Sequence, residues 1–197
     1  EEAISLIAQH GDEAKFLAGG HSLVPLMKLR LAQPSVLIDI GRVSDLSYVT
    51  DTGDHIAIGA LTRHLDVETS PIVLEHAPLL AHATSHVGDP QVRHRGTIGG
   101  SLAHADPASD LPATTLALGA TYVVLGPNGT REIPAGSFYE GYLTSVLDAD
   151  EMLTEIRVPK MNGAGWSFQK FNRRAQDWAK LWMVLIELIE IPLIFKQ

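Results

Sequence analysis

The chain of 197 residues contains no cysteine. It therefore has no disulfide, no thiolate nucleophile, and no iron–sulfur cluster or metal ion held by cysteines of its own. If the protein transfers electrons, the redox group must be organic or must belong to a partner chain. Hydrophobic residues make up 45% of the chain and charged residues 19%, which predicts one domain with a buried core, divided at most into two small lobes.

Basic residues are also scarce. The chain has 15 Lys and Arg residues against 23 Asp and Glu residues, which gives a formal net charge of −8. Non-specific nucleic-acid binding needs a basic surface that neutralises phosphates, so we expect no nucleic-acid partner. A ligand that carries phosphate would have to be held by local geometry instead.

Long apolar runs are missing at both ends. The first eight residues lack the basic start and the apolar stretch of a signal peptide, and they are typical of an amphipathic helix. Leu181–Phe195 is apolar, but Glu187, Glu190 and Pro192 interrupt it, and it is shorter than the roughly 20 residues that cross a bilayer. We therefore expect a cytoplasmic, soluble protein without a transmembrane segment.

Two glycine pairs stand out among the residues that are present. Each is expected to follow a strand-like run and to lead into a helix, so that its backbone N–H groups are free to face an anion. A serine hydroxyl follows each pair. A single Gly-Gly usually marks only a tight bend, whereas two of them suggest a ligand with two phosphates. Neither matches a dinucleotide-binding G-x-G-x-x-G or a Walker loop. The two segments are Ala18-Gly19-Gly20-His21-Ser22 and Thr97-Ile98-Gly99-Gly100-Ser101.

Residues 1–50 predict a small N-terminal lobe. A strand at Lys15–Ala18, a helix at Val24–Arg30 and a strand at Val36–Ile40 form a βαβ-like unit. Because Val36–Ile40 is mostly apolar, we expect it to be buried on both faces.

Residues 51–179 predict a larger lobe with antiparallel strands, so the fold class is α+β. Asp51-Thr52-Gly53-Asp54 is a hairpin turn, and so is Pro127-Asn128-Gly129. Asp110 is a candidate helix N-cap. The strands expected around the two turns are Leu46–Thr50, His55–Ala60, Tyr122–Leu125 and Thr130–Ile133, further strands are Met152–Val158 and Trp166–Phe171, and helices are Thr62–Thr69, Ile72–His86 and one from Asp110 to about Gly119.

Two other classes of site find little support. His82 and His86 are four residues apart on a predicted helix, as in some zinc sites, but no Glu follows His82 and Asp89 lies beyond the helix end, so we expect no metal site. Arg93-His94-Arg95 predicts a solvated basic turn, near a cofactor or a partner. No serine lies in a G-x-S-x-G elbow, which disfavours a serine hydrolase.

Three segments together carry a specific resemblance: residues 18–30, the run Asp89-Pro90-Gln91-Val92-Arg93 with residues 96–101, and residues 106–112. They resemble the FAD-binding medium subunits of the molybdenum hydroxylases, over residues 1 to about 179. The His-Ser after the first glycine pair and the Asp-Pro-Gln before the second are most similar to the branch of the family found in aerobic carbon monoxide dehydrogenases.

The resemblance implies a two-lobed FAD-binding domain of the vanillyl-alcohol-oxidase (PCMH) type, with FAD between the lobes and no catalytic residue in this chain. Asp110 would face the ribose or adenine end of FAD, Leu153 would contact the flavin, and Lys170 would lie near the flavin ring and favour its anionic reduced form. The diphosphate would be held by Phe16, Leu17, Ala18, Gly19, Gly20, His21, Ser22 and Leu23, and by Thr97, Ile98, Gly99, Gly100 and Ser101.

The family's reaction is divided among subunits. A large subunit with a molybdenum cofactor oxidises the substrate, a small iron–sulfur subunit relays electrons, and FAD passes them to an external acceptor. A dimer of such heterotrimers is implied, in the cytoplasm or at the inner face of the membrane. The substrate binds elsewhere, so xanthine, aldehyde and N-heterocycle dehydrogenases stay open beside carbon monoxide dehydrogenase.

The chain also departs from the family pattern. The family's opening strand and C-terminal domain are not found, and residues 180–197 are expected to be an atypical apolar tail. An alternative of another class therefore stays open, in which the chain keeps the fold but acts as a scaffold or interaction module without tight FAD binding.

Overall fold

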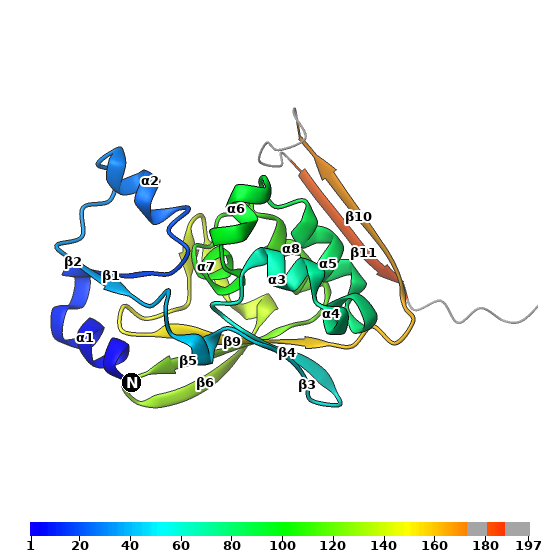
Figure 1. The fold of residues 1–197 in the computed structure, drawn as a ribbon, viewed down its shortest axis with the longest axis horizontal. Coiled ribbons are helices and arrows are strands. Elements are labelled where there is room, and N and C mark those ends of the chain that lie inside the picture. The colour runs from blue at the N-terminus through cyan, green and yellow to red at the C-terminus, as the bar shows by residue number, and fades with distance from the viewer. Residues whose placement is uncertain (173–180, 188–197) are drawn as a thin grey trace, which may run out of the picture.

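The computed structural model describes residues 1–172 and 181–187. Figure 1 shows a small lobe, built from the first strands and helices, beside a larger lobe in which helices cover one face of a sheet. Resemblance to the family thus gave the correct fold class. The sheet of the larger lobe begins with β3 (Val49–Asp51), which starts just before the expected lobe boundary at residue 51.

The small lobe has α1 (Glu2–His10), a 3-10 turn (Gly11–Glu13), β1 (Ala14–Leu17), α2 (Leu23–Lys28) and β2 (Val36–Asp39). β1 and β2 pair in parallel, as the predicted βαβ unit requires. Ile4 and Ile7 of α1 cover one face of this sheet, where they share an apolar cluster with Ile38 of β2. The other face is not covered in the same way, and Leu37 is 40% exposed. The expectation that β2 is buried on both faces was therefore wrong.

The larger lobe contains a five-stranded sheet in the order β3-β4-β9-β5-β6, in which every neighbouring pair is antiparallel. Both predicted hairpins are confirmed, and Gly53 and Gly129 adopt the positive φ that their turns require (97° and 104°). A 3-10 turn (Ser44–Leu46) leads into the sheet. The remaining strands of the sheet are β4 (His55–Gly59), β5 (Thr121–Gly126), β6 (Gly129–Pro134) and β9 (Met152–Pro159).

Six short helices lie on one side of this sheet (Figure 1). These helices are α3 (His64–Thr69), α4 (Pro71–His76), α5 (Pro78–Ser85), α6 (Pro90–Arg95), α7 (Ile98–Ala103) and α8 (Asp110–Ala117). All of them except α6 share one apolar core with Ile56, Ile58, Tyr122 and Ile156 of the inner face of the sheet.

Two helix predictions were wrong. The single helix expected at Ile72–His86 is broken at Ala77, because Pro78 has no N–H group and its ring excludes the helical conformation at the residue before it. The basic turn expected at Arg93-His94-Arg95 is instead the end of α6. This helix starts from Asp89, whose Oδ1 accepts a hydrogen bond from the N–H of Val92 at 2.9 Å.

Smaller elements complete the lobe. A 3-10 turn (Ala135–Ser137) precedes the antiparallel pair β7 (Tyr139–Gly141) and β8 (Thr144–Ser145). β10 (Gly165–Phe171) and β11 (Leu181–Glu187) form a separate antiparallel hairpin whose strands contact α5 and α8 respectively. Residues 181–187 of the expected apolar tail therefore form β11, and the rest of that tail lies outside the described residues. Within the described part of the chain, no helix is long and apolar enough to cross a membrane.

Gly99 is required by packing between α7 and the end of β4. A Cβ atom on Gly99 would lie 2.7 Å from the carbonyl oxygen of Ala60 and 2.8 Å from its Cα. We expect Gly99→Ala to lower the free energy of unfolding by about 1–3 kcal/mol, the usual effect of overpacking. Urea denaturation measures this, with Gly136→Ala as the control because its Cβ would meet only Leu116 at an ordinary 3.6 Å. Equal stability of the two variants would show that this contact relaxes freely.

Candidate functional site

A cavity of about 700 Å³ is lined by residues from both lobes, within the range typical of cofactor sites. The β1–α2 loop forms one side, the α6–α7 region another, and residues of β9 and β10 contribute to the rest. Every residue assigned to the site from the sequence lines this cavity except Ile98, which is fully buried in the core. The structure therefore brings together residues that lie up to 154 positions apart, Phe16 and Lys170.

The first glycine loop has the free N–H groups that its sequence predicts. It follows β1 directly, and Gly20 has a positive φ of 80°, which glycine adopts without strain. The backbone N–H groups of Gly19, Gly20, His21 and Ser22 have no acceptor among the described residues. Consecutive unpaired N–H groups of this kind form a concave binding surface for an anion.

The second glycine pair is built differently, and the expectation of free N–H groups there was wrong. It follows α6 instead of a strand, and both glycines lie in the first turn of α7. The N–H of Gly99 donates to the carbonyl of Ala60 at 2.8 Å, and that of Gly100 donates to Oγ1 of Thr97 at 3.2 Å. Both N–H groups are therefore already paired, one with the residue after β4 and the other with the N-cap of α7.

The first loop lies against the junction of α6 and α7, close to the second glycine pair. A Cβ atom on Gly19 would meet the carbonyl oxygen of Arg95 and would lie 2.9 Å from the Cα of Gly96, so this approach requires glycine in the first loop. A Cβ atom on Gly100 would lie 3.9 Å from the Cβ of Ala18, an ordinary contact, but only 2.7 Å from Oγ1 of Thr97. Gly100 is therefore required by the cap of α7 and not by the first loop.

Asp110 and Lys170 form a buried ion pair on the cavity wall. The Lys170 ammonium lies 3.0 Å and 3.1 Å from the two carboxylate oxygens, and the side chains are only 6% (Lys170) and 8% (Asp110) exposed. Lys170 also donates to the carbonyl of His86 at 2.8 Å. Burial raises the pKa of Asp110 to about 6, although Lys170 opposes this shift. The pair joins α8 to β10 directly beside the cavity.

The bounds of α8 correct one expectation. Asp110 is not the N-cap of its helix: Ser109 occupies that position, and Asp110 is the first residue of α8. The resemblance implies that Asp110 faces the ribose or adenine end of FAD and that Lys170 lies near the flavin ring, and the structure joins the two side chains. Both residues therefore face the same part of the cavity.

Several other residues line the cavity that no sequence motif indicates. His64, at the start of α3, is 3% exposed, and its Nδ1 has no partner among the described residues. The pKa of His64 is lowered to about 4, mainly by burial and to a smaller extent by nearby His21 and Arg93. The imidazole is therefore neutral at pH 7. Asp106 and Ser109 also line the cavity, and Ser109 hydrogen-bonds to Ser101, Oγ to Oγ, at 2.8 Å.

His64 is expected to make the protein sensitive to acid. Its pKa is 6.5 when unfolded and about 4 when folded, so the unfolded chain binds the proton more readily. The contribution of His64 to the free energy of unfolding is fully present above pH 6.5. It falls as the pH drops toward 4, by about 3 kcal/mol in total, because each unit of pKa difference corresponds to roughly 1.4 kcal/mol. Urea denaturation of the wild type and His64→Phe across this range measures the effect. Parallel pH profiles would contradict it.

His82 and His86 lie side by side at the end of α5 and pack against aromatic residues of β10. Their ring centroids are 4.5 Å apart, and the rings pack against Trp166 and Phe168 of β10 at 5.1 Å (His82 to Trp166) and 5.5 Å (His86 to Phe168). Among the described residues, no group of three or more metal-ligating side chains gathers anywhere. The two histidines instead help to attach β10 to α5.

Comparison with known proteins identifies the family. Residues 1–161 match the family described as the FAD binding domain in molybdopterin dehydrogenase. The chain is 49% identical over 179 residues to the carbon monoxide dehydrogenase medium chain of Hydrogenophaga pseudoflava, covering 90% of this chain and 62% of that one. It is 43% identical over 180 residues to the 6-hydroxypseudooxynicotine dehydrogenase complex subunit alpha of Paenarthrobacter nicotinovorans, covering 91% and 61%.

Solved structures with a similar fold come from the same kinds of enzyme as these relatives. A carbon monoxide dehydrogenase from Hydrogenophaga pseudoflava superposes with a TM-score of 0.89 at 49% identity, covering 90% of this chain and 62% of that chain. Quinoline 2-oxidoreductase from Pseudomonas putida 86 superposes with a TM-score of 0.87 at 36% identity, again covering 90% and 62%. The chain thus spans less than two thirds of the length of these relatives. With this fold, this cavity and these matches, the chain belongs to the family of FAD binding domains in molybdopterin dehydrogenases.

Proposed function

We propose that this chain binds FAD between its two lobes and forms the electron-transfer flavoprotein part of a molybdenum hydroxylase. The observation that carries the proposal is the row of unpaired N–H groups at Gly19–Ser22 on the wall of a 700 Å³ cavity. Such donors suit the diphosphate of FAD, and the flavin and adenine need apolar walls. Leu23, Leu61 and Leu153 supply apolar side chains in the same cavity.

The residues present fit FAD sterically. The first loop reaches the α6–α7 junction only because Gly19 has no side chain, and Gly20 provides the turn. The loop can therefore hold its N–H groups in a fixed row before the cofactor arrives. Such preorganisation reduces the entropy that binding must lose.

FAD, when bound, supplies redox chemistry at its flavin ring, and the protein tunes this chemistry by nearby charge and hydrogen bonds. The ammonium of Lys170 is a buried cation on the cavity wall, held there by Asp110. His64 adds a neutral, buried imidazole behind the loop. Because the chain has no cysteine, iron–sulfur clusters would belong to another subunit.

The partners in this proposal are a small iron–sulfur subunit, a large molybdenum-cofactor subunit and an external electron acceptor, assembled as a dimer of heterotrimers. The names of the relatives, a medium chain and a subunit of a dehydrogenase complex, support the presence of partner subunits. We place the complex in the cytoplasm or at the inner face of the membrane.

The substrate proposed first is carbon monoxide, because the relative at 49% identity is a carbon monoxide dehydrogenase medium chain. Relatives that act on N-heterocycles or glyceraldehyde support the alternative of another dehydrogenase of this type. The substrate would bind on the large subunit, so residues of this chain do not select it.

The complex purified with this chain tests the proposal. Substrate should reduce the iron–sulfur clusters in complexes with the wild type and with Gly19→Ala, whereas only the wild-type complex should contain FAD and reduce the external acceptor. Visible spectra separate the clusters from the flavin. A flavin-free wild-type complex that still reduces the acceptor would leave the chain as a scaffold and would overturn the proposal.

A further inference from the structure

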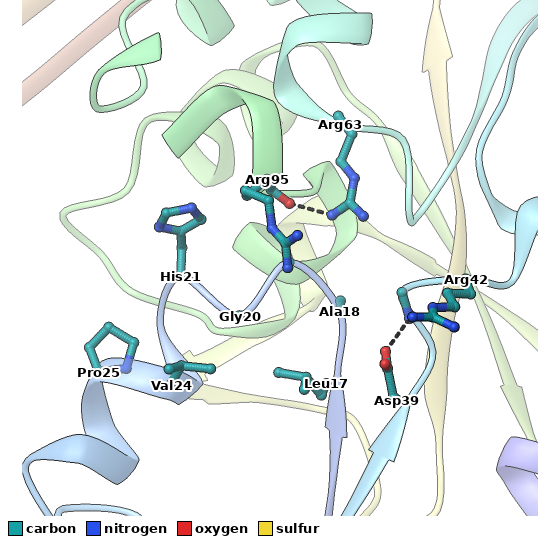
Figure 2. Close-up of a pocket in the computed structure, with 12 residues that line it drawn as sticks. Leu17, Ala18, Gly20, His21, Val24, Pro25, Asp39, Arg42, Arg63 and Arg95 are labelled. Atoms are coloured by element: carbon teal, nitrogen blue, oxygen red, sulfur yellow. Dashed lines mark hydrogen bonds between the residues drawn. The ribbon is translucent and has the colours of Figure 1, made fainter. Parts of the chain in front are cut away.

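A second cavity, of about 560 Å³, shares the first glycine loop as a wall. Figure 2 shows the side chains of Arg42, Arg63 and Arg95 gathered around the loop near Ala18. They come from three places: the segment after β2, the residue before α3 and the end of α6. None of the three lines the larger cavity, so the proposed FAD site leaves their role open.

These three arginines lack acidic partners. Among the described residues, no carboxylate forms an ion pair with any of them. Other arginines are paired: Arg93 lies 2.8 Å from Glu68, and Arg131 lies 2.6 Å from Glu151. Three guanidinium groups against the single carboxylate of Asp39 give the lining of this cavity a net positive charge, in a chain whose net charge is −8.

The one carboxylate in the cavity does not neutralise them. Asp39 lines the same cavity, and its Oδ1 accepts a hydrogen bond from the N–H of Gly41 at 2.9 Å (Figure 2). Arg63 is fixed in place because its guanidinium donates to the carbonyl oxygen of Arg95. Burial lowers the pKa of Arg63, and the nearby charge of Arg95 contributes a repulsion in the same direction, which the carboxylates of Asp66 and Asp39 oppose. An anion in the cavity would relieve this repulsion.

The shape and the other walls indicate which anion fits. A guanidinium group presents a planar fork of donors that matches phosphate oxygens. Unpaired N–H groups of Gly19 and Gly20 belong to the shared wall. Leu17, Val24 and Pro25 form an apolar side of the cavity, and Val24 is 49% exposed. A phosphate joined to a sugar and a base would use both kinds of wall.

We infer that the cavity of Arg42, Arg63 and Arg95 binds the phosphate of a nucleotide. The nucleotide is either the ADP half of FAD, in which case the inference rests on the proposed function and adds the arginines to the FAD site, or a separate nucleotide that binds beside FAD. In both cases the arginines bind a nucleotide phosphate, and the second step of the experiment below distinguishes the two sources.

The first step tests the arginines. The flavin-free chain is titrated with ADP and with inorganic pyrophosphate by calorimetry, for the wild type, Arg42→Gln and Arg95→Gln. Each substitution should weaken ADP binding about tenfold, or about 1.4 kcal/mol. Arg30→Gln is the matched control, because Arg30 lies in the same lobe as Arg42 and lines neither cavity. Circular dichroism shows that the variants are folded. Wild-type affinity in both variants, or no ADP binding by the wild type, overturns the inference.

The second step identifies the source of the phosphate. Wild-type chain saturated with FAD is titrated with ADP again. Loss of ADP binding, together with weaker FAD binding in Arg95→Gln, assigns the site to FAD itself. ADP binding that persists and stays sensitive to Arg95→Gln assigns it to a separate nucleotide. If the wild type binds ADP through the arginines but takes up no FAD, the proposed function fails and the arginine site stands.

Discussion

Gly19→Ala is expected to weaken FAD binding about 100-fold. The new Cβ atom would meet the carbonyl oxygen of Arg95 and the Cα of Gly96, and both of these are backbone atoms that cannot swing aside. The loop would have to move away from the α6–α7 junction, so its N–H groups would no longer face the diphosphate together. Loss of two hydrogen bonds to a charged group, at about 1.5–3 kcal/mol each, corresponds to at least this change.

Fluorescence titration of the flavin-free chain with FAD measures the change. Gly141→Ala is the matched control, because a Cβ atom there meets nothing within 4 Å. The control should bind FAD as the wild type does, and both variants should keep the wild-type circular dichroism spectrum. FAD affinity within about twofold of the wild type in Gly19→Ala would show that the close approach of the loop is not needed.

The second large effect is expected at the buried ion pair. Lys170→Met removes the ammonium from a carboxylate that is only 8% exposed, and leaves the charge of Asp110 in a poorly solvated place. Removing one partner of such a pair usually costs about 3–5 kcal/mol of stability. Urea denaturation at pH 8 measures this loss, because Asp110, whose pKa is raised to about 6, is then ionised in the wild type.

A double variant distinguishes the unpaired charge from lost packing. Lys170→Met combined with Asp110→Asn removes both charges, so it should recover a large part of the stability that Lys170→Met loses. The pH dependence gives a second signature. Asp110 without its lysine should be protonated over a wider range, so Lys170→Met should regain stability as the pH falls. Equal stability of the single and double variants at every pH would show that the pair contributes only packing.

The predictable parts of this site are those encoded by neighbouring residues. Gly19-Gly20-His21-Ser22 follows an apolar strand, and its free N–H groups could be inferred because glycine and turn chemistry act locally. The hairpins at Gly53 and Gly129 were predictable for the same reason. The resemblance to the FAD-binding family supplied the ligand and the pairing of two distant glycine motifs.

The parts that the sequence did not reveal depend on contacts between distant segments. The N–H groups of Gly99 and Gly100 are already paired because α7 lies against the end of β4, which no local pattern indicates. Asp110 and Lys170 meet across 60 positions of sequence. The break before Pro78 follows from a local signal that the helix predicted at Ile72–His86 did not take into account. Arg42, Arg63 and Arg95 are scattered in sequence and form a positive cavity only in the folded chain.

FAD and FMN differ in the part of the cofactor that the Gly19–Ser22 loop is proposed to hold, because FMN has the same flavin ring but only one phosphate and no adenosine. Calorimetric titration of the flavin-free wild-type chain should show FAD binding at least about 100-fold more tightly than FMN, the equivalent of about 2.8 kcal/mol. Equal affinities for the two flavins, or a chain that binds neither, would contradict the account.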